Sequence, residues 1–159
     1  MPSTFKLSTL LQNSYAASAV RAPIRHSVPE INASLTNAWS VAAEFTGTGA
    51  NVILVDTGLV IKVNTVTQLD PITRATIVPT QVKGFIISVA GPTGGAAVTV
   101  ASAGFCKLTT SAAMNLPIGG VFALHLPTTA NATASESLTI TIPAAGYTVS
   151  VVAYGSGPA

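Results

Sequence analysis

The chain has 159 residues, 48% of them hydrophobic and only 8% charged, and its formal net charge is +2. That length is enough for one domain with a substantial core. The composition excludes an intrinsically disordered chain, which would combine low hydrophobicity with high charge. The sequence also lacks the run of roughly 18 apolar residues that a membrane-spanning helix requires. A net charge this small does not indicate nucleic-acid binding by the whole chain.

The scarcity of charge is the most informative feature of the composition. An ordinary soluble domain contains about 25% charged residues, which help to keep its surface soluble. Here the mean hydropathy is +0.58. We therefore expect much of the surface to be buried against other subunits. The alternative is a free surface covered by Ser and Thr hydroxyls.

Residues 1–36 are predicted to form an N-terminal arm, followed by one domain at 37–159. Positive charge is concentrated in the arm, because no acidic residue precedes His26. Four apolar or aromatic residues at helical spacing predict a short helix near its start: Leu7, Leu10, Leu11 and Tyr15. The same stretch is too polar for an export signal. The arm could lie on its own domain or dock on a neighbouring subunit.

The rest of the chain is rich in short, alternating segments separated by Gly and Pro, a pattern typical of strands. We predict about nine strands and no internal helix, which indicates an antiparallel, jelly-roll-like β-sandwich. Residues 64–79 are expected to cross between the two sheets. The predicted strands lie at 39–45, 51–55, 59–63, 83–89, 96–101, 105–108, 120–126 and, as a closing hairpin, 138–142 with 147–154.

The closing hairpin is predicted to have one buried face and one uncharged outer face. A turn at 143–146 would join its two strands. The outer face would consist of hydroxyl residues, namely Thr139, Thr141, Thr148 and Ser150. An exposed hairpin usually carries a charge that deters edge pairing. We therefore expect a neighbouring subunit to cover this face.

The sequence Asp56-Thr57-Gly58 is the catalytic signature of aspartic proteases, in which two such aspartates share one proton. However, a strand resumes directly after it, and Asp-x-Gly also suits a tight hairpin turn. We favour the turn and keep a small dimeric protease as a remote alternative. Pepstatin-sensitive proteolysis that is lost on Asp56→Asn would reverse this preference.

No set of residues in the sequence predicts catalysis or cofactor binding. The single cysteine, Cys106, lies in an apparent strand and is interpreted as a small buried residue. Two histidines about a hundred residues apart, with scattered acids, give no metal-ligand spacing. The glycine-rich stretches lack a following Lys-Ser/Thr for phosphate. We expect no enzyme activity, no metal and no cofactor.

The second half of the chain resembles the β-sandwich structural proteins of tailed-bacteriophage virions, in particular capsid decoration (cement) proteins. The resemblance rests on the order of strands and turns in 82–155, including Gly84-Phe-Ile-Ile-Ser-Val-Ala, Leu116-Pro-Ile-Gly-Gly-Val-Phe-Ala-Leu and Leu138-Thr-Ile-Thr-Ile. The family implies homodimers or homotrimers that sit on the capsid surface at junctions between major capsid subunits. It supplies no catalytic residues, and residues 1–36 match nothing in it.

The resemblance implies a virion protein, made in the host cytoplasm, whose partner is the major capsid protein. In that case the arm residues that would bind a neighbour are Phe5, Leu7, Leu10, Leu11 and Tyr15, with Arg21 and Arg25 pairing with carboxylates. Membrane and nucleic-acid partners are not expected. Two structural alternatives are a tail, baseplate or fibre protein that binds host glycans, and a jelly-roll major capsid protein.

Overall fold

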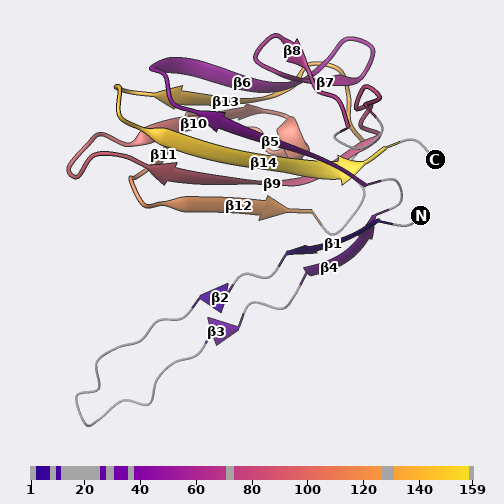
Figure 1. The fold of residues 1–159 in the computed structure, drawn as a ribbon, viewed down its shortest axis with the longest axis horizontal. Helices are drawn as coiled ribbons and strands as arrows, with labels where there is room; N and C mark the ends of the chain where they lie inside the picture. The colour runs from indigo at the N-terminus through magenta and orange to yellow at the C-terminus, as the bar shows by residue number, and fades with distance from the viewer. Residues whose placement is uncertain are drawn as a thin grey trace.

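The computed structural model describes residues 3–7, 10–11, 26–27, 31–35, 38–70, 74–126 and 131–157, with side chains from residue 39 onward. From residue 38 on, ten strands form two antiparallel sheets that face each other (Figure 1). The four-stranded sheet contains, in order, β12 (Val121–His125), β9 (Gln81–Ala90), β14 (Thr148–Ser156) and β5 (Ala38–Phe45). The six-stranded sheet contains β11 (Met114–Leu116), β10 (Val98–Ala103), β13 (Glu136–Ile142), β6 (Gly49–Asp56), β7 (Val60–Val63) and β8 (Val66–Thr67).

The strand pairs are nested, so that the first strand of the sandwich pairs with the last. β5 pairs with β14, β6 with β13, β9 with β12, and β10 with β11. This is the arrangement of two interleaved Greek keys that defines a jelly roll. The short strands β7 and β8 are an addition at the end of the six-stranded sheet. The predicted all-β, antiparallel, jelly-roll-like sandwich is therefore confirmed.

The core follows the alternation seen in the sequence. Inward residues of the two sheets interdigitate between the layers, as expected for packed sheets. The four-stranded sheet contributes Val41, Phe45, Phe85, Ile87, Val89, Val149 and Val151. The six-stranded sheet contributes Ile53, Val55, Ile61, Val98, Val100, Leu138, Ile140 and Ile142. A period of two thus correctly identified which face of each strand is buried.

The predicted closing hairpin is wrong in its pairing. β13 pairs with β10 and β6, whereas β14 pairs with β5 and β9, so the two strands belong to opposite sheets. The segment 143–147 crosses from one layer to the other. Both arrangements bury the same apolar residues, but the crossing gives each strand two hydrogen-bonded neighbours instead of leaving one edge open.

The strand that we predicted at 105–108 is wrong. The segment includes a 3-10 turn, η1 (Phe105–Lys107). Its backbone is left-handed at Cys106 and Lys107, with φ of 52° and 55°. Gly104, also left-handed, starts the turn, and Lys107 N donates to Gly104 O at 2.8 Å. The predicted crossover at 64–79 is confirmed in part: its first residues include β8 of the six-stranded sheet, and the chain passes to β9 of the other sheet only after β8.

The described parts of the arm form a two-stranded hairpin. β1 (Ser3–Leu7) pairs with β4 (Ile31–Leu35), and β2 (Leu10–Leu11) pairs with β3 (His26–Ser27). The hairpin leaves the sandwich on the side where β12 lies and points away from it (Figure 1). Of the four residues that predicted a short helix, Leu7 lies in β1, Leu10 and Leu11 lie in β2, and Tyr15 lies outside the described residues. β5 begins two residues after the predicted boundary at 36.

Candidate functional site

The Asp56-Thr57-Gly58 sequence forms the turn between β6 and β7. Leu59 N donates to Asp56 O at 2.9 Å, and both Gly58 and Leu59 have positive φ. The Asp56 carboxylate accepts hydrogen bonds from Lys62 and from Thr57. These contacts, with the Lys62 bond the largest, lower the pKa of Asp56 to about 2. The carboxylate is therefore held ionised, unlike the proton-sharing aspartates of an acid protease.

Cys106 is buried and has the properties of a structural residue. Its Sγ lies 3.8 Å from Val82 O. Burial raises the pKa of the thiol to about 12, and the charge of Glu136 adds to the shift. A thiol that stays protonated is a poor nucleophile and a poor metal ligand. The prediction of a buried Cys106 is confirmed, although its backbone is a turn and not a strand.

Two side chains meet across Gly84 at one end of the four-stranded sheet. His125 Nδ1 lies 3.0 Å from the Tyr154 hydroxyl, and the two rings are stacked with centroids 6.0 Å apart. Gly84 lies between their strands, and a Cβ there would overlap the Tyr154 hydroxyl and the Leu124 carbonyl. Burial lowers the pKa of His125 below its usual 6.5, and the charge of nearby Lys83 lowers it further. This end of the sheet therefore favours a neutral imidazole.

A second polar cluster closes the loop before β13. Glu136 is only 5% exposed. It accepts hydrogen bonds from Thr133 Oγ1 at 2.9 Å and from Lys107 Nζ at 3.1 Å. A buried carboxylate with both a charge partner and a hydroxyl donor is satisfied. We assign this cluster a structural role in joining η1 to β13.

The structure places the predicted arm residues along the hairpin as far as it describes them. Phe5 is opposite Ala33 and Leu7 opposite Ile31, while Leu10 and Leu11 lie in β2. The other three predicted contact residues, Tyr15, Arg21 and Arg25, lie outside the described residues. A two-stranded hairpin is marginal in water and gains stability only when it is covered. The arm is thus suited to contact with another surface.

The predicted outer hairpin face is split between the two sheets. Thr139 and Thr141 lie on the outer face of the six-stranded sheet, whereas Thr148 and Ser150 lie on the outer face of the four-stranded sheet. They cannot form one contact surface. Thr139 and Thr141 have uncharged neighbours such as Val52, Thr99 and Ala101, whereas Ser150 lies opposite Glu44 on the other sheet. The predicted lack of charge therefore holds around Thr139 and Thr141, whereas Ser150 has a charged neighbour.

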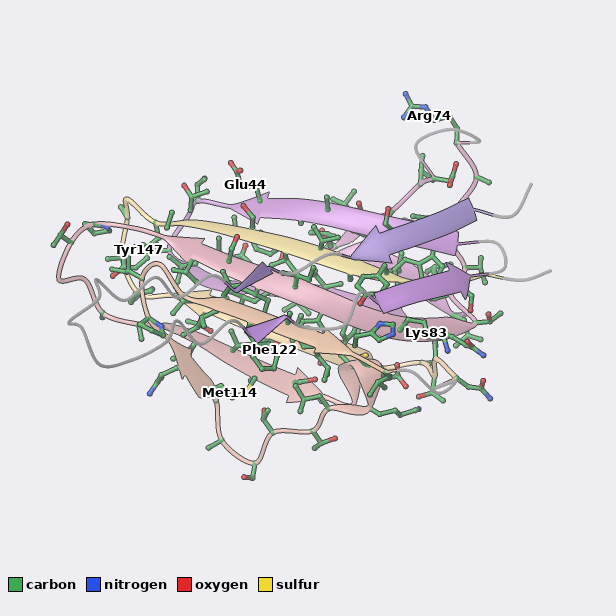
Figure 2. All side chains as sticks on the ribbon, turned by 90° about the horizontal axis from the view of Figure 1, so that it is seen from below. Glu44, Arg74, Lys83, Met114, Phe122 and Tyr147 are labelled. Carbon is green, nitrogen blue, oxygen red and sulfur yellow. The ribbon has the colours of Figure 1, made fainter. Side chains whose placement is uncertain are left out.

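The sequence did not identify one further surface, at the side of the sandwich formed by β11 and β12. We call it the β11–β12 flank and define it as residues 114–126. Its apolar side chains are packed against the core yet only partly buried, and they are Met114, Leu116, Ile118, Phe122, Leu124 and Leu126. Figure 2 views the molecule from this side, with Met114 and Phe122 labelled. The only sequence signal was the absence of charge throughout 108–135.

Comparisons with known proteins supply no assignment: no family model, no curated protein and no solved structure matches this chain. Within the described residues, no three His, Cys, Asp or Glu side chains are grouped as metal ligands would be. No helix in the described part of the chain is long and apolar enough to cross a membrane. The function must therefore be inferred from the fold and its surfaces.

Proposed function

We propose that this chain is a structural protein of a virus particle, seated in or on the protein shell. The observation that carries the proposal is a charge-poor jelly roll from which a hairpin arm projects (Figure 1). Large, permanent contacts between subunits favour apolar, weakly charged surfaces. An arm that leaves the sandwich can extend the contact area of a small subunit to its neighbours.

Its expected place is on the capsid surface, as a decoration protein bound at junctions between major capsid subunits. The phage resemblance of the second half supports this place. The uncharged neighbours of Thr139 and Thr141 on the outer face of the six-stranded sheet are compatible with it, because a bound subunit needs one face for the shell. The arm would then reach across the junction to a neighbouring subunit.

A second candidate is a jelly-roll subunit that builds the shell itself. The nested strand pairing favours it, because jelly rolls are frequent among viral capsid domains. Jelly rolls also occur in lectins, and the glycan-binding alternative would require exposed aromatic rings on loops. The aromatic side chains that the structure describes, all from residue 39 onward, are buried or half-buried, which disfavours that alternative.

Purification of the full chain separates the two candidates. A decoration protein stays as small oligomers and binds preformed shells, whereas a shell-forming subunit assembles into closed particles by itself. Negative-stain microscopy and a shell co-sedimentation assay distinguish these outcomes. Both candidates would be contradicted if the protein neither assembled by itself nor bound shells of the virus that encodes it.

Point variants identify the contact surface. We expect Leu7→Glu in the arm to abolish shell binding or self-assembly while far-UV circular dichroism stays unchanged. Thr141→Lys and Ser150→Lys form a matched pair, since they place one charge on opposite outer faces. The face that contacts the shell is the one whose lysine variant fails to assemble. Full assembly by all three variants would refute the use of these surfaces.

A further inference from the structure

The edge strand β12 has a free side. Within the described residues it pairs only with β9. Leu126 N donates to Lys83 O at 2.8 Å and Val89 N donates to Gly120 O at 3.1 Å, so the even-numbered residues face β9. Because backbone groups alternate in an antiparallel strand, the N–H and C=O groups of Val121, Ala123 and His125 point away from β9. In the described part of the chain no strand accepts them.

This edge has none of the features that usually prevent pairing with another chain. Natural edge strands carry charged residues, prolines or bulges that block such pairing. The segment Val121-Phe-Ala-Leu-His125 has no Lys, Arg, Asp, Glu or Pro, and its register with β9 is regular throughout. The Val121 side chain is 64% exposed. The edge is thus open, apolar and regular.

The apolar surface continues around the β11–β12 flank. Its half-buried side chains come from the edge strands of both sheets and from the turn between them. Side chains at this place would fill the core of a larger sandwich if a further layer were added. The flank therefore combines backbone groups that have no described strand partner with apolar side chains that are only partly buried. Strand addition uses this combination.

We infer that the β11–β12 flank is a two-fold interface with a second copy of this chain, formed by antiparallel pairing of β12 with β12. The register that fits is centred on Ala123. In it Ala123 is opposite Ala123 of the partner subunit, and Val121 is opposite His125 of the partner subunit. All the outward N–H and C=O groups of one edge then meet those of the other, which is the self-complementarity that a two-fold interface requires.

The side chains are compatible with this register, and they favour a second copy over a charged partner. The flank has no charge with which to select a different protein, whereas it presents identical apolar side chains to a copy of itself. No like charges become opposed, because His125 lies opposite Val121 of the partner subunit and residues 121–125 contain no Lys, Arg, Asp or Glu. The hairpin arm leaves the sandwich on this same side, so in a dimer it would have to lie beside the second copy (Figure 1).

The interface concerns the free protein in solution and goes beyond the proposed function. It can exist whether or not the chain belongs to a virus shell. A dimer without any shell binding would refute the proposed function and leave this inference intact. A monomer that still decorates shells would do the opposite.

The first test is the mass of the full chain by sedimentation equilibrium, with two matched variants. Val121→Lys places a charge on the free edge of β12, and Ala42→Lys places the same charge on an exposed position of β5, the opposite edge of the same sheet. We expect a dimer for the unaltered chain and for Ala42→Lys. Val121→Lys should weaken the dimer by about tenfold or more, with an unchanged circular dichroism spectrum.

The second test reports the register and does not depend on weakening the dimer. Paired residues that exchange two hydrogen bonds have Cα atoms about 5.5 Å apart, within the range that a disulfide or short crosslinker can join. Ala123→Cys should therefore give a covalent dimer on mild oxidation or with a short bismaleimide, and Ala42→Cys should not. Cys106 does not interfere, because it is buried.

Three results would overturn the inference. They are a monomer at the highest soluble concentration, a trimer or larger ring, and a dimer that both Val121→Lys and Ala42→Lys leave unchanged. A dimer whose Ala123→Cys form fails to crosslink would refute the register and, with it, the two-fold strand pair.

Discussion

The two edge strands of the four-stranded sheet, β5 and β12, differ in charge and in how far their side chains are exposed. β5 carries an acidic residue, Glu44, and is anchored at its start, because Trp39 Nε1 donates to Ser156 O at 2.9 Å. β12 carries no formal charge and leaves Val121 exposed and Phe122 half-buried. One edge therefore ends the sheet, whereas the other is suited to continue it. A single sheet thus combines one edge strand that carries a charge and one that carries none.

The largest effect should come from Gly84→Ala, which disturbs the packing of β12 against β9. The added methyl group would overlap the Tyr154 hydroxyl and the Leu124 carbonyl, so β9 and β12 must separate. We expect a loss of about 3 kcal/mol in the free energy of unfolding, measured by urea denaturation. Gly47→Ala is the matched control, because nothing lies within 4 Å of a Cβ there. Equal stability of the two variants would contradict the close packing at Gly84.

A smaller effect should follow from Trp39→Phe, which loosens the β5 edge. The ring stays in the core, but the indole N–H donor to Ser156 O is lost. The carbonyl keeps its bond from Thr80 N at 2.9 Å, so it is not left unpaired. We expect a loss of about 1 kcal/mol in the free energy of unfolding and unchanged dimerisation. A dimer that dissociates in this variant would place the interface at β5 instead.

The smallest effect is a pH dependence of stability. It distinguishes His125 in β12 from Asp56 in the β6–β7 turn, because the two groups titrate in different pH ranges. The folded-state pKa of His125 lies below 6.5, so the unfolded chain binds the proton more tightly. Stability should therefore decrease as the pH falls below 6.5, until the folded-state pKa is passed. The pKa of Asp56 is lowered from 3.8 to about 2, so its contribution is lost only between these values.

Thermal melts of the unaltered chain and of His125→Gln between pH 7.5 and 4.5 measure this dependence, because Asp56 stays ionised throughout that range. The melting temperature of His125→Gln should change less with pH. A larger pH dependence in the variant than in the unaltered chain would contradict the assigned direction of the His125 shift.

The sequence predicted the faces of the strands better than their partners. Alternation in β13 and β14 correctly placed Leu138 and Val149 in the core, because burial repeats every second residue. The same alternation is satisfied by a hairpin and by a crossing between sheets, so it could not distinguish them. Left-handed backbone at Cys106 and Lys107 is equally invisible to periodicity, although Gly104 gave a hint.

The candidate interface was harder to predict for a related reason. Whether β12 is an edge or an interior strand depends on which strands surround it, and strand order is a property of the whole chain. The sequence showed that 120–126 is apolar and uncharged, which suits either position. Only the observed order, with β9 on one side of β12 and no described strand on the other, changes the same residues from core strand to contact surface.

The nested pairing of the strands also has a consequence for how the protein forms. The hydrogen bond between Trp39 and Ser156 joins residues 117 positions apart, and β6 likewise pairs with the distant strand β13. Folds dominated by such distant pairs close slowly, because the chain must lose much entropy before the contacts form. During synthesis the sandwich can close only when its last strand has left the ribosome. Until then the first strands, β5 and β6, stay without their final partners and are open to wrong ones.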